Sequence, residues 1–198
     1  MLYFIGYNSA MNLNFCGNTN GGIYKGVYVK EFCPLQGCKG EIVLSLLIEQ
    51  SLRTKSVYFE VYNSVGEWNL YWNYEISPVD FLPVMKKYAK KGATLQEAME
   101  DEMVVGEVLK LAKTYVCHLN EDDITIIKRI AEKGLPDVNR KKPQGLDGHS
   151  YEIKLYNIEK EYRCWCVVPE EWGDLIPLIE LFVAKADLNE RYLIDGTN

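Results

Sequence analysis

The chain has 198 residues and a mass of 22.8 kDa, which is enough for one domain or two small ones. Hydrophobic residues make up 47% of it and charged residues 25%, a composition that supports a buried core and excludes disorder, collagen-like repeats and a coiled coil. Because 28 Asp and Glu outweigh 22 Lys and Arg to give a net charge of −6, we expect no nucleic-acid partner.

The N-terminal region, residues 1–40, is rich in Gly and Asn and contains short extended pieces at 2–7 and 23–32. Its first residues lack the basic start of a signal peptide. The longest apolar stretch, Ile42–Ile48, is far shorter than a membrane span. We therefore expect a cytoplasmic protein without a membrane partner.

Three strands are predicted next. Residues 42–49 form a continuous apolar run, whereas 56–62 alternate Val and Phe with Tyr and Glu. In 67–76 the Trp and Leu residues share one face, which is the period-2 pattern of a half-buried strand. The turn sequence at 63–66 joins the last two strands into an antiparallel hairpin.

A helical region follows, with clear start and stop signals. Ser77–Asp80 supplies an N-cap and a proline in the first turn, and Gly92 ends this helix. Thr94–Glu97 is a capping box that predicts a longer helix reaching about Cys117. Asn120–Asp123 caps a third helix.

A second hairpin is predicted at 150–156 and 161–168, followed by an apolar helix over 174–187. The element order is thus strands, helices, strands and a helix. This order favours an α+β fold, in which antiparallel hairpins form a sheet packed against about four helices, over a parallel nucleotide-binding sheet.

The basic segment 137–148 contains Pro and Gly and separates the helical region from the second hairpin. We expect a single α+β domain over residues 1–198. A subdomain boundary at 135–148 is the alternative.

The cysteines do not suggest a disulfide-stapled mini-domain, because the chain is too long and too poor in cysteine. Cys33 and Cys38 share a loop at near-metal spacing, but one pair cannot complete a tetrahedral zinc site. We expect mostly reduced thiols acting as small core residues, no metal and no cofactor. The six are Cys16, Cys33, Cys38, Cys117, Cys164 and Cys166.

Two histidines, His118 and His149, are the candidates for a general base near neutral pH. His118 directly follows Cys117, and neighbours on a helix diverge by about 100°, so these two do not form a dyad. A helix C-cap explains His118 better, and a tight turn explains His149. We therefore assign no catalytic residue, and a small enzyme using Cys16 or Cys33 with His149 stays as an alternative.

An acidic set, Glu97, Glu100 and Asp101, lies at i, i+3 and i+4 and so on one face of the predicted helix. Such a face suits a metal ion, a carboxylate-dependent enzyme or a basic partner. A solvated face in the first helical turns explains it better. We carry it as a second acidic binding face.

The acidic excess is concentrated toward the C-terminus, where residues 135–198 carry 12 acidic and 8 basic side chains. Acids around exposed aromatic residues suit a protein–protein face better than a small-molecule pocket. Burial of Trp172 under the last helix is the alternative, and the aromatic hairpin is equally suited to a homodimer face. The predicted partner-binding residues are Glu159, Glu161, Tyr162, Trp165, Glu170, Glu171 and Trp172.

The C-terminal third also carries a family resemblance. Leu146–Ile153 is followed by Tyr162–Trp165, then by Pro169 and an apolar helix. This arrangement resembles a hairpin–helix of small bacterial proteins with the pattern Leu-Asp-Gly, a small residue, Tyr or Trp with Glu, then Tyr-Arg-x-Trp. Some of these are similar to immunity proteins of polymorphic-toxin and contact-dependent secretion loci. His149 departs from the pattern, in which Ser or Thr is more usual.

The resemblance implies a non-enzymatic bacterial protein that neutralises a cognate toxin by stoichiometric binding. The expected partner is a basic toxin or effector domain, which acidic side chains would attract. A phage or mobile-element inhibitor of a host defence system is an alternative with the same binding physics.

Overall fold

A computed structural model describes residues 35, 37–50, 56–76, 78–93, 97–98, 101–137, 149–165 and 168–188. The predicted extended pieces at 2–7 and 23–32 lie outside these ranges, as do Cys16, Cys33, Glu100, Cys166 and most of the basic segment 137–148.

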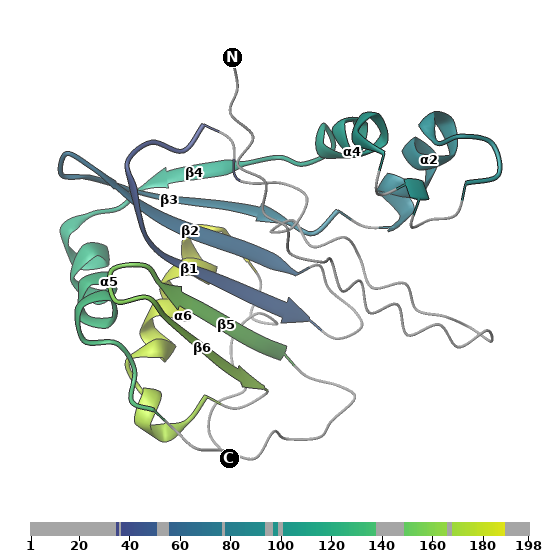
Figure 1. The fold of residues 1–198 in the computed structure, drawn as a ribbon. Helices are drawn as coiled ribbons and strands as arrows, with labels where there is room; N and C mark the ends of the chain where they lie inside the picture. The colour runs from purple at the N-terminus through teal and green to yellow at the C-terminus, as the bar shows by residue number, and fades with distance from the viewer. Residues whose placement is uncertain are drawn as a thin grey trace.

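The described residues form a six-stranded sheet in which every neighbouring pair is antiparallel (Figure 1). Its spatial order is β4-β3-β2-β1-β5-β6, so β4 and β6 are the two edges. The strands are β1 (Glu41–Gln50), β2 (Val57–Ser64), β3 (Glu67–Tyr74), β4 (Tyr115–His118), β5 (His149–Leu155) and β6 (Lys160–Trp165).

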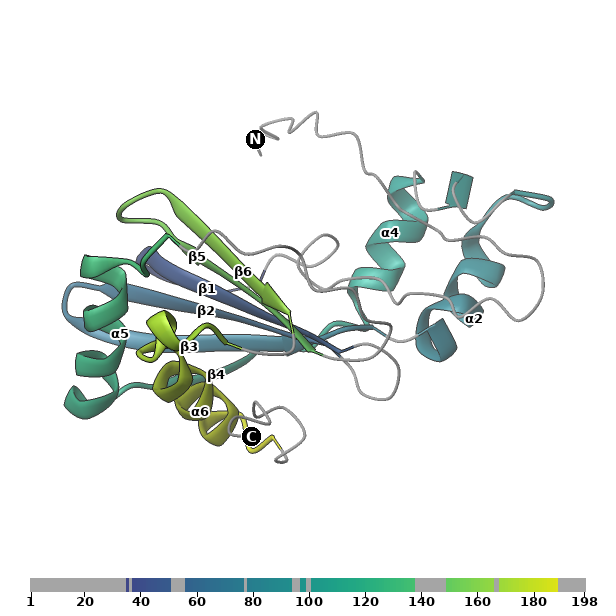
Figure 2. The same ribbon diagram turned by 90° about the horizontal axis from the view of Figure 1, so that it is seen from below.

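The predicted α+β class and both predicted hairpins are therefore confirmed. Four α-helices and one short 3-10 helix accompany the sheet in the described part of the chain. Figure 2 shows α5 and α6 on one side of the sheet, with α2 and α4 beyond one end of it. The helices are α2 (Pro78–Tyr88), α4 (Glu102–Leu109), α5 (Glu121–Lys133), η1 (Glu170–Trp172) and α6 (Leu175–Lys185).

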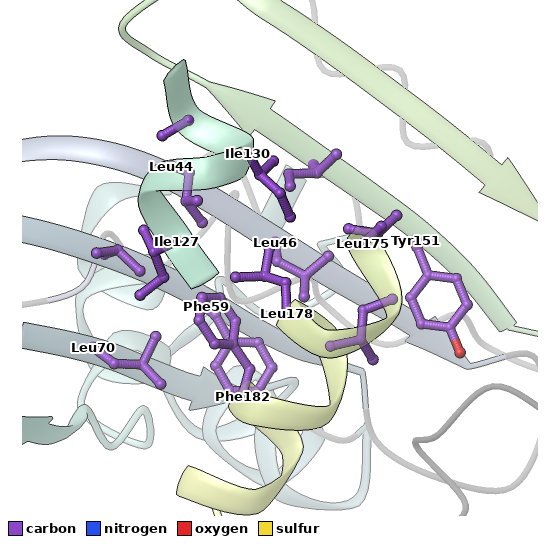
Figure 3. Packing of buried hydrophobic residues seen from close by; sticks show 14 of the residues in the cluster. Leu44, Leu46, Phe59, Leu70, Ile127, Ile130, Tyr151, Leu175, Leu178 and Phe182 are labelled. Atoms are coloured by element: carbon purple, nitrogen blue, oxygen red, sulfur yellow. The ribbon is translucent and has the colours of Figure 1, made fainter. Parts of the chain in front are cut away.

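The main core lies between the sheet and helices α5 and α6 (Figure 3). Alternate residues of β1, among them Leu44 and Leu46, point into it and are fully buried. Phe59 of β2 meets Phe182 of α6 with ring centroids 5.2 Å apart. Burying each such side chain contributes about 1.5–3 kcal/mol, so this face dominates the stability of the fold.

Helices α5 and α6 are joined by one buried carboxylate. Asn120 and Asp123 form a capping box at the start of α5, with reciprocal side-chain to backbone hydrogen bonds of 2.9 Å. The same Asp123 carboxylate lies 2.6 Å from Lys185 Nζ at the end of α6. One side chain thus satisfies a helix N-terminus and fixes the second helix against it.

Helices α2 and α4 pack on each other around a separate small core. Its fully buried members include Phe81 of α2 together with Val104 and Val108 of α4. These helices are inserted between β3 and β4, which are adjacent antiparallel strands. We refer to residues 78–109 as the helical arm.

The predicted long helix over 94–117 is wrong. Asp101 accepts hydrogen bonds from the backbone N–H groups of Met103 and Val104, so a new helix begins there and ends at Leu109. Residues 115–118 are then captured as a strand by the free edge of β3, where Tyr115 stacks on Trp72 with ring centroids 5.5 Å apart. Within the described ranges, no helix is long and apolar enough to cross a bilayer.

The tip of the β2–β3 hairpin carries backbone strain. Val65 has φ +50° and Gly66 has φ +89°, which are the positive values that a type I′ turn requires. A β-branched residue is disfavoured in this region, and Val65 is fully exposed, so no packing compensates.

Replacing Val65 by Asn creates the Asn-Gly sequence that type I′ turns favour. We expect Val65→Asn to raise the free energy of unfolding by about 0.5–1 kcal/mol in urea denaturation. Val65→Ala, which removes the branched side chain without the turn preference of Asn, should give a smaller gain. A loss of stability in Val65→Asn would contradict the turn geometry.

Candidate functional site

The predicted partner-binding region is organised around the loop that follows α5. The Tyr162 hydroxyl accepts a hydrogen bond of 3.0 Å from the backbone N–H of Leu135. The indole N–H of Trp172 donates a bond of 2.7 Å to the carbonyl oxygen of Pro136. The two rings meet edge to face, 5.6 Å apart. This aromatic pair therefore fixes β6, η1 and the loop in one arrangement.

Gly134 makes this close approach feasible. It ends α5 with φ +69°, and a Cβ atom placed on it would lie 2.7 Å from the Tyr162 hydroxyl and 2.9 Å from Cδ1 of Ile158. Both the backbone conformation and the space favour glycine. The glycine that ends α5 thus also leaves the space that the Tyr162 hydroxyl occupies.

Exposed carboxylates lie close in sequence to both members of the aromatic pair. Glu159, at the β5–β6 turn, and Glu170 and Glu171, in η1, all have exposed side chains. Among the described residues, Glu159 and Glu170 form no ion pair, whereas Asp137 is 3.7 Å from Lys160 Nζ. We call Glu159, Glu170 and Glu171 the acidic rim.

The structure divides the predicted partner-binding set between two layers. Tyr162 and Trp172 are 6% and 5% exposed, so they form the base of the site and not its surface. Burial of Trp172, the alternative reading of the sequence, is what the structure shows. The burial of Tyr162 has a signal in the sequence, because the period-2 alternation of β6 places this residue on the apolar face of the strand.

Glu161 and Trp165 lie on the opposite face of the sheet from Tyr162, because neighbouring residues of a strand alternate. There Glu161 Oε1 is 2.9 Å from Arg163 Nε, and Arg163 Nη2 is 2.9 Å from Glu152 Oε2. Trp165 is half-buried. The charge of Glu161 is thus shared with an arginine and contributes less to an acidic surface.

The second predicted acidic face does not form as expected. Glu97 and Asp101 do not share one continuous helix, because Asp101 is the N-cap of α4. Both instead line an open cavity of about 470 Å³ with Lys90 and Lys91. Charges of both signs therefore line this cavity, and the use of Glu97 and Asp101 as a binding face stays a prediction.

The candidate catalytic residues are spread over the sheet. Cys117 points toward the main core and His118 toward the other face, since they are neighbours on β4 and not on a helix. His149 is the first residue of β5, with its ring 6.4 Å from that of Tyr151. Three strands separate β4 from β5, so the two histidines do not meet.

A polar network on the second face of the sheet was not predicted from the sequence. Glu60 of β2 accepts hydrogen bonds from the hydroxyls of Tyr58 (2.5 Å) and Tyr62 (2.9 Å). Leu35 and Tyr71 complete a small cluster around them. The signal was available, because Tyr, Glu and Tyr alternate on one face of the strand predicted at 56–62.

Several titratable side chains in and near this network have raised pKa values. Burial, and then the Glu60 charge, raises the pKa of the Cys38 thiol to about 11. The same two causes raise the pKa values of Tyr58 and Tyr62 above the ordinary range of tyrosine. Burial also raises the pKa of Cys117. Protonated thiols are weak nucleophiles, so these two cysteines favour packing over catalysis.

Comparison with protein-family models, with curated proteins and with solved structures finds no match to the chain. The resemblance of the C-terminal third to immunity proteins therefore stays a prediction.

Removing the Tyr162 hydroxyl tests the base of the site. In Tyr162→Phe the buried N–H of Leu135 loses its acceptor, and we expect the free energy of unfolding to fall by about 1–3 kcal/mol. Tyr156, a half-exposed tyrosine in the turn between β5 and β6, provides the matched control. Tyr156→Phe should change the free energy of unfolding by less than about 0.5 kcal/mol. Equal effects of the two variants would refute the proposed anchoring.

Alkylation at controlled pH tests the second-face network. With a pKa of about 11 in place of the ordinary 9.0, native Cys38 has about 100-fold less thiolate at pH 8 than in the unfolded chain. We expect iodoacetamide labelling of Cys38, read by peptide mass spectrometry, to be slower by at least that factor in the native protein than in urea.

The difference should close only as the pH approaches 11. Glu60→Gln removes the charge that helps to hold the thiol proton and should accelerate native labelling, whereas Glu67→Gln should not. Equal native and unfolded rates at pH 8 would contradict this assignment. Because the raised pKa values of Tyr58 and Tyr62 favour the protonated native state, the stability they contribute is lost as the pH rises above about 10.

Proposed function

We propose that this chain is a non-enzymatic bacterial binding protein, an immunity protein that neutralises a cognate toxin by stoichiometric binding. The observation that carries the proposal is the acidic rim, three exposed carboxylates built on the buried Tyr162–Trp172 pair. The partner would be a basic toxin or effector domain, bound outside the sheet at the β6 edge.

The charge distribution supports this partner chemistry. Residues 149–188 carry eight acidic and four basic side chains. Part of this charge is neutralised within the chain, as in the Arg129–Asp174 contact of 3.4 Å, but Glu159 and Glu170 have no such partner among the described residues. Unpaired surface carboxylates accelerate association with a basic protein and disfavour acidic competitors.

Rigidity supports binding by occlusion. The acidic rim is attached to a β-turn and a 3-10 helix that the aromatic pair and the Gly134–Pro136 loop hold in place. A preorganised surface loses little conformational entropy when it binds, so more of the interaction energy appears as affinity. An inhibitor that must outlast an active toxin benefits from the slow dissociation that results.

The proposal is tested by capture of the partner with the full-length tagged chain in its native host, followed by work with both purified proteins. Light scattering should give a 1:1 complex. Expression of the partner alone should arrest growth, and coexpression of the chain should restore it. The dissociation constant should rise with salt, because exposed charges contribute to the contact.

Charge reversal locates the surface. We expect Glu159→Lys with Glu170→Lys to weaken partner binding by at least about tenfold, mainly through slower association, and to reduce its salt dependence. Glu67→Lys with Glu102→Lys changes the net charge equally at two exposed carboxylates elsewhere, on β3 and α4, and is the matched control.

Equal loss in both double variants would indicate a general charge effect and overturn the acidic rim as the site. A captured partner that is harmless when expressed alone would overturn the immunity function. A host defence enzyme as the captured partner would instead support the phage-inhibitor alternative.

A further inference from the structure

A small cavity lies between α5 and the end of the sheet at which β1 begins. Its volume is about 200 Å³, which is smaller than the roughly 300–1,000 Å³ of sites for cofactors and other small molecules. The buried part of its lining consists of Val43, Trp68 and Ala131. A cavity of this size suits a single side chain of another protein better than a nucleotide. We call it the α5 cavity.

Polar side chains from the sheet, from α5 and from the β5–β6 turn complete the lining of the α5 cavity. Glu41, Asn63 and Trp68 are directly paired across β1, β2 and β3, so their side chains project from the same face of the sheet, toward α5. Asn63 Oδ1 already accepts a hydrogen bond of 3.2 Å from the backbone N–H of Gly66, so it belongs to the hairpin turn. The polar lining residues are Glu41, Asn63, Lys128, Glu132 and Asn157.

The charges of the α5 cavity are separated along the sheet. Lys128 Nζ lies 5.5 Å from the centroid of the Trp68 ring on β3, whereas the loop that follows α5 binds Tyr162 of β6. The helix therefore crosses the sheet from β3 toward β6 (Figure 1). Glu132, one turn after Lys128, lies on the side of β1 and of the β5–β6 turn. The cavity thus has a positive end over β3 and a negative end at Glu132 and Glu41.

The carboxylates of the negative end are not neutralised within the described part of the chain. Glu41 and Glu132 are exposed, and neither takes part in an ion pair among the described residues. Lys128, four residues before Glu132 and so on the same side of the helix, is instead placed over the indole ring of Trp68, where a cation–π interaction holds it. The last carbonyl groups of α5 add partial negative charge at the same end. This end of the cavity therefore favours an external cation.

We infer that the α5 cavity takes the guanidinium group of an arginine side chain from the basic partner, bound at the negative end by Glu41 and Glu132. This inference rests on the proposed function and adds a specific anchor to it. A guanidinium group presents five N–H donors in a planar fork, whereas an ammonium group presents three. The acceptors at this end come from three separate elements, because Asn157 adds its side-chain carbonyl to the two carboxylates. Such a set suits the cation that has more donors.

The α5 cavity and the acidic rim share one turn of the chain. Asn157 lines the cavity and Glu159 belongs to the rim, and both lie in the turn 156–159 between β5 and β6. A basic protein that the rim attracts thus meets the cavity within the same contact. Arginine side chains in pockets are frequent anchors of protein interfaces. A free guanidinium compound would reach the cavity alone and gain nothing from the rim, which favours a protein as the source of the group.

Titration of the full chain with N-acetyl-L-arginine amide, followed by NMR, tests the cavity without the partner. We expect shifts of the Trp68 indole N–H and the Asn157 side-chain amide, with a dissociation constant on the order of 1–10 mM. N-acetyl-L-lysine amide should bind at least threefold more weakly. Glu41→Gln with Glu132→Gln should weaken arginine binding at least tenfold, whereas Glu67→Gln with Glu102→Gln, which removes the same charge elsewhere, should not. Equal binding of the two probes, or no shift at Trp68, would overturn the inference.

Kinetics with the captured partner separate the cavity from the rim. Because a side chain held in a pocket resists release, Glu41→Gln with Glu132→Gln should raise the dissociation rate at least tenfold, whereas charge reversal in the rim mainly slows association. The bound partner should also abolish the NMR shifts caused by N-acetyl-L-arginine amide.

An unchanged dissociation rate in Glu41→Gln with Glu132→Gln would overturn the inference and leave the proposed function standing. Capture of no basic partner would overturn the proposed function and, with it, the protein source of the guanidinium group. Binding of N-acetyl-L-arginine amide in that case would instead assign the cavity to a free guanidinium compound.

Discussion

The antiparallel pairing of β1 with β5 is the constraint on which the rest of this structure depends. It joins segments that are far apart in sequence, as the hydrogen bond from Ser150 to Glu49 shows across 101 residues. β1 thereby becomes an interior strand with neighbours on both sides. Because β6 pairs with β5 at the edge of the described sheet, the β1–β5 ladder also decides where Tyr162, Trp172 and the acidic rim are placed.

The two faces of the sheet are stabilised in different ways. The core face is apolar and is covered by α5 and α6, whose positions are coupled through Asp123 and Lys185. The second face carries tyrosines and carboxylates, and around Glu60 it buries them in a hydrogen-bonded network. Buried polar groups are tolerated when they are paired. Contacts on both faces thus stabilise the sheet.

Function, in this interpretation, is placed at the β6 edge of the sheet. The β6 edge combines a buried aromatic base with exposed carboxylates, which suits a basic protein partner. The helical arm has its own core, and its Glu97 and Asp101 line a cavity together with Lys90 and Lys91.

The sequence by itself determined the class of the fold and most of its elements. Period-2 alternation identified β2 and β3, and capping residues identified the start of α5. Each of these signals is contained within a few neighbouring residues. The same local signals failed at 94–117. There Asp101 caps a new helix, and Tyr115–His118 pair with the edge of β3 as a strand. No local sequence pattern describes that edge.

The candidate site divides in the same way. Its residues were named from charge and aromatic content, and four of the seven, Glu159, Glu161, Glu170 and Glu171, are exposed as expected. Which of them face the same direction was decided only by the tertiary structure. Burial of Tyr162 and Trp172 depends on their contacts with Leu135 and Pro136, distant residues that the β1–β5 pairing and the end of α5 bring to them.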